Sequence, residues 1–74
     1  RADEPSPPVP VRIGASLALS GKLAFMGLAE RTALEMAVES VNARGGVVGR
    51  PLELRVEDNL GDARAAVTSV SKLL

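Results

Sequence analysis

The sequence predicts an α/β fold, the start of a parallel, doubly wound sheet with the order strand, helix, strand, helix. Two short segments carry apolar residues at alternate positions, and each precedes a segment in which apolar residues recur at three-and-four spacing. Turn residues separate these segments. Strands that alternate with helices of this length pair in parallel through right-handed crossovers.

The first strand is expected over residues 11–19, VRIGASLAL. One of its faces carries the apolar residues Val11, Ile13, Ala15, Leu17 and Leu19. From Ile13 onward the other face carries only small side chains, so helices can cover both faces, as they do around an interior strand of a parallel sheet. We therefore expect this strand to have a neighbour on each edge.

A loop over residues 20–27 and a helix over residues 28–42 are expected next. The apolar residues of the helix fall on one side: Ala33, Leu34, Ala37, Val38 and Val41. The polar residues fall on the other side, which we expect to face solvent: Arg31, Glu35, Glu39 and Asn42. Gly45 or Gly46 can adopt the left-handed conformation that follows a helix end.

The second strand is expected over residues 52–58, LELRVED, and the second helix from Asp62 onward. Apolar and charged residues alternate in the strand, so one face is exposed to water, as is typical of an edge strand. Asp58 at its end is assigned a structural role, and Asp62 is a suitable N-cap. The predicted apolar stripe of the helix is Ala63, Ala66, Val67, Val70, Leu73 and Leu74.

The domain organisation predicted is a proline-rich, extended tail over residues 1–10 and an incomplete domain over residues 11–74. The tail holds four of the five prolines. A chain this short buries only about 60% of its unfolded surface and usually needs disulfides, a metal or a partner. Because cysteine and histidine are absent, we expect further polypeptide, from the same protein or a second one, to complete the domain.

The composition excludes several function classes. Nine basic residues balance nine acidic ones, and Phe25 is the only aromatic residue, so nucleic-acid binding is disfavoured. The segment EDNLGD lacks the ligand spacing of an EF-hand, and neither a metal nor a cofactor is expected. No apolar stretch approaches the roughly 20 residues that cross a bilayer. A mature exported protein whose leader has been removed would have this appearance.

The loop after the first strand, SLALSGKLAFMG, must be tested as a phosphate-binding loop. Six residues separate Gly14 from Gly21 where a P-loop has four, and Leu23 rather than serine or threonine follows Lys22, so the P-loop spacing and the magnesium ligand are both missing. The dinucleotide-binding pattern fails as well, because Gly27 is too far along the chain. Nucleotide binding is therefore disfavoured.

The position of this loop still favours a binding site. Ligands of open parallel sheets bind beyond the carboxyl ends of the strands, where this loop begins. Phe25 and Met26 offer apolar surface and Ser20 offers a hydroxyl, which suits a small amphiphilic solute. A packing role for Phe25 and Met26 in a core is an equally good interpretation of these residues alone.

The ordered motifs resemble one known family. An "IG" strand, "LSG" followed by "G", "VNARGG", "GRPLEL" and "EDNLGD" before an alanine-rich helix occur together between Val11 and Leu74. This set resembles the amino-terminal end of the branched-chain amino acid binding proteins, the type I periplasmic solute-binding proteins of ABC transporters. Members have two α/β lobes joined by a hinge, and the resemblance implies that this chain begins the first lobe.

The resemblance also implies a function and a site. It implies a periplasmic binding protein and not an enzyme, one that closes its lobes around an amino acid or a related small organic acid and presents it to a membrane permease. The implied ligand-binding residues are Ser20, Gly21, Phe25 and Met26, with Met26 against the solute side chain. Many members have an aromatic residue at the position of Met26 and a proline at that of Ala18. The groups that hold the carboxylate and ammonium of the solute lie in later segments.

Two other interpretations stay open on the sequence. A regulatory ligand-sensing domain can have the same fold and differs only in what surrounds it. A flavodoxin-like or receiver domain shares the alternating order of elements, but a receiver needs acidic residues after its first strand to hold magnesium, and LALSG has none.

Overall fold

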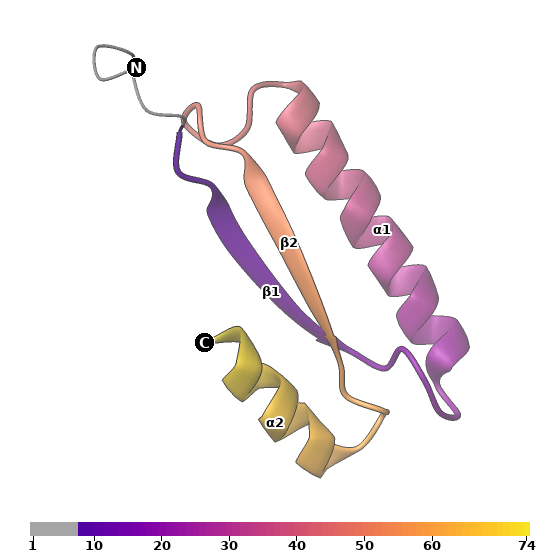
Figure 1. Ribbon diagram of the computed structural model, residues 1–74. Coiled ribbons are helices and arrows are strands. Elements are labelled where there is room, and N and C mark those ends of the chain that lie inside the picture. The colour runs from indigo at the N-terminus through magenta and orange to yellow at the C-terminus, as the bar shows by residue number, and fades with distance from the viewer. Residues whose placement is uncertain (1–7) are drawn as a thin grey trace.

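The computed structural model describes residues 8–74, so the first seven residues of the predicted tail lie outside it. The elements are β1 (Val11–Leu17), α1 (Ala24–Ala43), β2 (Leu52–Asp58) and α2 (Ala63–Leu73). The two strands pair in parallel, from Val11 opposite Leu52 to Leu17 opposite Asp58. Figure 1 shows them as a central layer with α1 on one side and α2 on the other. The predicted α/β class, order of elements and parallel pairing are confirmed.

Each helix covers one face of this sheet. The α1 face carries Leu54 and Val56 of β2, which together with Val38 of α1 line an open hollow of about 700 Å³. On the α2 face, Gly14 of β1 lies so close to the second helix that a Cβ there would be 3.1 Å from the Cβ of Leu73. The small residues on this side of β1 therefore admit a helix, as predicted. Within residues 8–74, β1 pairs only with β2, and a neighbour on its second edge stays a prediction.

The first strand is shorter than predicted and ends at Leu17 rather than Leu19. The carbonyl oxygen of Leu17 accepts the last sheet-like bond, from the backbone N–H of Asn59 at 2.8 Å. Two residues later, the backbone N–H of Leu19 donates to Oδ1 of Asp58 at 2.9 Å. A side chain has thus replaced the neighbouring strand as acceptor, and the chain turns away from β2.

The first helix begins four residues earlier than predicted, at Ala24 rather than Leu28. The N–H of Ala24 donates to the carbonyl oxygen of Gly21 at 3.2 Å, and the N–H of Gly27 donates to that of Leu23 at 3.1 Å. Gly27 is therefore inside the helix and does not open it. The prediction was wrong because a glycine close to a helix end resembles a helix boundary in sequence.

The far end of α1 agrees with the prediction. Gly45 and Gly46 have φ angles of +100° and +78°, and the N–H of Gly46 donates to the carbonyl oxygen of Val41 at 3.0 Å. The amide of Asn42 then bonds both backbone groups of Leu52, its Oδ1 accepting from N–H at 2.7 Å and its Nδ2 donating to the carbonyl oxygen at 2.9 Å. This amide joins the end of α1 to the start of β2.

The predicted solvent-facing side of α1 is partly wrong. Glu35 and Glu39 are exposed, but Arg31 is half-buried. Its Nε atom is buried and has no hydrogen-bond partner among residues 8–74. Arg31 lies one turn beyond Gly27, the residue of α1 that is buried, and so shares its side of the helix.

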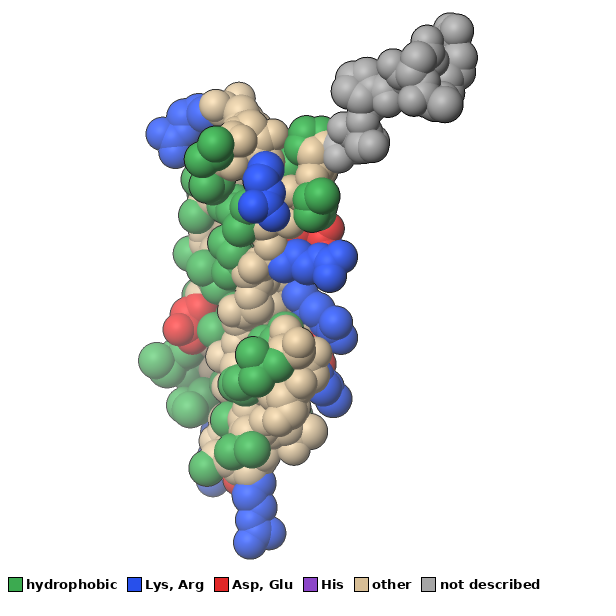
Figure 2. Space-filling model, turned by 90° about the vertical axis from the view of Figure 1, so that its left-hand side faces the viewer, with side chains coloured by type: hydrophobic (Ala, Val, Ile, Leu, Met, Phe, Trp, Pro, Cys, Tyr) green, Lys and Arg blue, Asp and Glu red, His purple; other side chains and the backbone are tan. Residues whose placement is uncertain are grey.

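The second helix begins as predicted, but only part of its predicted stripe faces the sheet, since Ala66 and Leu73 are half-buried. Its buried residue is Ser69, 2% exposed, whereas Val67 of the predicted stripe is 71% exposed. Oγ of Ser69 lies 2.5 Å from Oγ of Ser16 on β1, and Oγ of Ser16 accepts from Nδ2 of Asn59 at 3.2 Å. This close polar contact favours a small residue at the interface and turns the valines outward. Figure 2 shows apolar side chains on the outer face of this part of the molecule.

Asp62 caps α2 as predicted, since its Oδ2 accepts from the backbone N–H of Ala65 at 3.0 Å. In the full-length protein we expect Asp62→Ala to lower the free energy of unfolding by about 1 kcal/mol, because an orphan N–H loses its acceptor. Urea denaturation measures the change. Asp62→Asn is the matched control, since asparagine caps about as well and should cost only a few tenths of a kcal/mol. Equal losses in both variants would contradict the capping role.

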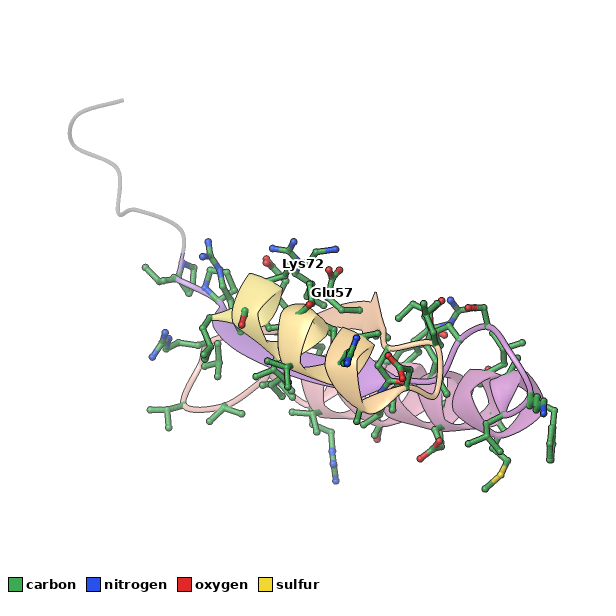
Figure 3. The ribbon with its side chains drawn as sticks, turned by 90° about the horizontal axis from the view of Figure 1, so that it is seen from below. Glu57 and Lys72 are labelled. Atoms are coloured by element: carbon green, nitrogen blue, oxygen red, sulfur yellow. The ribbon has the colours of Figure 1, made fainter. Side chains whose placement is uncertain are left out.

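Charged side chains lie on the α2 side of β2. Glu53 and Arg55 are exposed, as predicted for one face of this strand, but Glu57 is half-buried. Glu57 lies between two cations: its Oε2 is 3.9 Å from Nε of Arg55, and its Oε1 is 3.9 Å from Nζ of Lys72. Figure 3 shows Glu57 on the strand and Lys72 on α2 side by side. Because both cations are mostly exposed, these pairs contribute little to stability.

No hydrophobic side chain is fully buried among residues 8–74. Leu34 and Val38 of α1 and Leu54 of β2 lie between the layers but stay half-buried. The same residues include no helix with the length and apolar character needed to span a bilayer.

Candidate functional site

Two loops meet at the carboxyl edge of the sheet, one after each strand. We call residues 18–23 the first loop and residues 59–62 the second loop. Both lie at the same end of the sheet because the strands are parallel, and α1 and α2 start from them (Figure 1). Ligands of open parallel sheets bind at this edge, which makes it the candidate site.

Asp58, the last residue of β2, holds the two loops together. Its Oδ1 accepts from the backbone N–H of Leu19 in the first loop and from that of Leu60 in the second, both at 2.9 Å. Its Oδ2 accepts from the hydroxyl of Ser20 at 2.7 Å. The structural role expected of this residue is thus a specific one, since one carboxylate satisfies three donors from two loops.

These bonds set the ionisation of Asp58. The hydroxyl of Ser20 contributes most, and together with the backbone N–H of Leu60 it holds the pKa of the carboxyl below its ordinary value of 3.8, against a smaller opposing effect of desolvation. Each of these donors favours the charged form. The carboxylate is therefore the state that ties the loops.

A pH dependence of stability follows. Because the pKa of Asp58 is lower in the folded state than in the unfolded state, its stabilising contribution is complete above 3.8 and is lost as the pH falls through the folded value. We expect wild type to be more stable than Asp58→Asn at neutral pH and the gap to narrow below about pH 4. Thermal unfolding of both proteins from pH 7 to pH 3 measures this gap, and parallel profiles would contradict the assignment.

Close backbone contacts also fix the first loop. Gly21 has a φ angle of +83°, and a Cβ there would lie 3.0 Å from the carbonyl oxygen of Leu60 in the second loop. A Cβ on Gly27 would lie 1.7 Å from the carbonyl oxygen of Ala18. The first turn of α1 therefore sits directly against the first loop, so any shift of this loop also moves the start of the helix.

The four predicted site residues lie at this edge, but not all of them in the loop. Phe25 and Met26 belong to the first turn of α1, which corrects the predicted loop over residues 20–27. Their side chains are 72% and 51% exposed, so neither packs in a core among residues 8–74. Ser20 is half-buried and Gly21 is exposed. The edge thus presents two large apolar side chains beside one hydroxyl.

Part of the arrangement was not apparent in the sequence. Ser20 was predicted to offer its hydroxyl to a solute, yet this hydroxyl already donates to Asp58 and can only accept a further bond. Leu23, which is not among the predicted site residues, is 47% exposed and precedes α1. It lines an open hollow of about 340 Å³ with Ala18, Gly61 and Ala66. The sequence feature that could have identified Leu23 is an apolar residue placed between the pair Gly21-Lys22 and the start of the helix.

This edge combines apolar surface with a few polar groups. Among residues 8–74 no group of acidic, histidine or cysteine side chains could hold a metal ion. Asp58 is engaged by three donors, so it is no free base. An exposed apolar pair, a hydroxyl oxygen and backbone groups can accommodate a small molecule with an apolar part.

The structure is an α/β segment with two loops at the carboxyl edge of a parallel sheet. The family model described as "Periplasmic binding protein" matches residues 10–74, and the chain belongs to this family. The Leu/Ile/Val-binding protein of Escherichia coli strain K12 is 33% identical over 64 residues, which are 86% of this chain and 17% of that protein. The Leu/Ile/Val-binding protein homolog 7 of Brucella abortus strain 2308 is 36% identical, over 78% of this chain and 16% of its own length.

Solved structures agree with this assignment. The substrate-binding protein of a fatty acid ABC transporter from Thermomonospora curvata superposes with a TM-score of 0.84 and 34% identity, over 88% of this chain and 17% of its own. The branched-chain amino acid transporter substrate-binding protein of Streptococcus pneumoniae, in complex with isoleucine, gives a TM-score of 0.83 and 33% identity, over 86% and 18%. The chain thus spans about a sixth of the length of these relatives, and the predicted family and fold are confirmed.

Proposed function

We propose that this chain is part of the first lobe of an extracytoplasmic solute-binding component of an ABC transporter. Residues 11–74 would supply the first βαβα segment of that lobe. The observation that carries the proposal is the exposed pair Phe25 and Met26, held at the carboxyl edge of a parallel sheet beside Ser20 and Gly21. A relative named Leu/Ile/Val-binding protein and one named fatty acid ABC transporter substrate-binding protein support a solute with an apolar part.

The proposed solute is an amino acid, branched-chain or otherwise aliphatic, or a related small organic acid. Met26 would contact its apolar part, since a thioether is flexible and adapts to aliphatic or flat surfaces. Ser20 could then accept a bond from the solute, because its own hydrogen is donated to Asp58. The groups that hold a carboxylate and an ammonium would come from later segments.

The mechanism we propose is lobe closure. A solute that touches this edge and a second lobe together favours the closed state, because only that state makes both sets of contacts. A membrane permease would be the partner that receives the solute. The periplasm would be the compartment, as the name of the family implies.

Calorimetric titration of the full-length protein tests the proposal. The probes are L-leucine, L-isoleucine, L-valine, L-phenylalanine and octanoate. We expect at least one to bind, and we expect Met26→Ser to weaken that binding about tenfold, since burying a methionine side chain is worth roughly 1.5–3 kcal/mol and 1.4 kcal/mol is a factor of ten.

Met36 supplies the matched control. It lies on the same helix, is 65% exposed and is ten residues from Met26, away from the loops. Met36→Ser should leave the affinity unchanged. Binding of no probe, or equal losses in the two variants, would contradict the proposal. Uptake of the bound probe by cells with and without the cognate permease gene separates a transport function from the regulatory alternative. Uptake that fails without the permease gene would support transport.

A further inference from the structure

We propose that Asp58 is a positioning residue for solute binding, one that holds the first loop and the start of α1 in the geometry that presents Met26. The proposal rests on the function proposed above and adds a residue that the predicted site did not contain. Asp58 need not touch the solute. It acts through the loop whose residues do.

Three donors meet at the carboxylate of Asp58. Leu19 and Ser20 are adjacent in the first loop, and both donate to Asp58, at 2.9 and 2.7 Å. Leu60 in the second loop donates at 2.9 Å. A single side chain therefore fixes the backbone and the hydroxyl of the first loop against the second loop.

Backbone hydrogen bonds connect the first loop with Met26. Gly21 follows Ser20 directly, and its carbonyl oxygen accepts the N–H of Ala24, the first residue of α1. The N–H of Met26 donates to the carbonyl oxygen of Leu23 at 3.0 Å. Two hydrogen-bonded turns therefore connect Ser20, which donates to Asp58, with Met26.

Close backbone contacts leave the first loop little room to rearrange. Gly21 lies against the carbonyl oxygen of Leu60, and Gly27 lies against that of Ala18, so the first loop is packed on both sides. Removing the carboxylate leaves three donors without their protein acceptor. Because all three bonds are exposed, water can satisfy these donors, but water does not tie the first loop to the second. A loop that must be ordered again on binding lowers the affinity, because the ordering costs free energy at that moment.

Two variants separate positioning from general stability. Asp58→Ala removes every acceptor. Asp58→Asn keeps Oδ1 for the two backbone donors, and its Nδ2 can donate to Oγ of Ser20, which reverses one bond but keeps the loops tied. Gly49→Ala is the control, because its φ angle of +74° disfavours a Cβ there, which lowers stability at the opposite end of the sheet and meets nothing within 4 Å.

The experiment is calorimetric titration of the full-length protein with the probe that wild type binds most tightly, together with thermal unfolding of each variant. We expect Asp58→Ala to lower the affinity about tenfold and Asp58→Asn less than about threefold. Gly49→Ala should lose thermal stability but bind as wild type does. An unchanged affinity in Asp58→Ala, or an equal loss of affinity in Gly49→Ala, would overturn the positioning role.

If Asp58→Ala does not fold, Asp58→Glu replaces it. The longer side chain of glutamate cannot place a carboxylate oxygen where Oδ1 of Asp58 accepts from both Leu19 and Leu60, so an affinity about fivefold lower is expected in a folded protein. Affinity equal to wild type in that variant would overturn the proposal. Binding of no probe by wild type would instead refute the proposed function itself, which keeps the two failures distinct.

Discussion

Replacing Gly27 by alanine should destabilise the full-length protein by about 3 kcal/mol and weaken solute binding with it. The added Cβ would lie 1.7 Å from the carbonyl oxygen of Ala18 and 2.4 Å from its carbonyl carbon. Both are backbone atoms, so no side-chain rotation relieves the overlap. Either α1 must move away from the first loop or the loop must move with it.

The direction of the change in the free energy of unfolding tests the contact between Gly27 and Ala18. Alanine in place of glycine stabilises an unconstrained helical position by about 1 kcal/mol. Urea denaturation of Gly27→Ala measures the difference, and Ser40→Ala, an exposed change on the same helix, is expected to stay within about 0.5 kcal/mol of wild type. A stabilised Gly27→Ala protein would show that α1 does not approach Ala18 as closely as the structure has it.

Replacing Gly21 by alanine should cost about 1–2 kcal/mol and lower the affinity for solute. Its φ angle of +83° is unfavourable for a residue with a Cβ. That Cβ would also lie 3.0 Å from the carbonyl oxygen of Leu60. The two loops would then separate, and the bonds of Ser20 and Leu60 to the shared carboxylate would lengthen.

Gly49 offers a control at the opposite end of the sheet. It has a comparable φ angle of +74°, but a Cβ there would meet nothing within 4 Å. Gly49→Ala should therefore lose stability for the backbone reason alone and bind as wild type does. Thermal unfolding and calorimetry of both variants make the comparison, and equal affinities would speak against a role for the loop contact in binding.

The elements that could be predicted are those whose local signal agrees with their packing. β2 alternates cleanly, and its bounds were predicted correctly at Leu52 and Asp58. The cap of α2 was likewise predicted, because Asp62 needs only the N–H of Ala65 three residues further on. Both depend on neighbours along the chain and not on distant contacts.

The errors occur where distant residues decide. The start of α1 was missed because Gly27 is required by its contact with Ala18, a contact that periodicity does not reveal. The predicted apolar stripe of α2 included Val67 and Val70, yet both are exposed, and Ser69 is buried beside the hydroxyl of Ser16 on β1. A hydrophobic pattern assigns such a position to solvent.

The site shows the same division. Phe25 and Met26 were identified as candidate contacts from their residue types and their place after a strand, and the structure exposes both at the expected edge. The link from Asp58 to Leu19 and Ser20 joins residues 38 and 39 positions apart and was not predicted. Residue types indicate the surface chemistry of a site, whereas its supports depend on the tertiary fold.

The most direct measurement of the central claim is a crystal structure of the full-length protein with the probe it binds most tightly. We predict the probe at the carboxyl edge of the sheet, with its apolar part in van der Waals contact with Met26 and a polar atom near Oγ of Ser20. A probe bound elsewhere, or Met26 covered by neighbouring polypeptide with no solute beside it, would contradict the account.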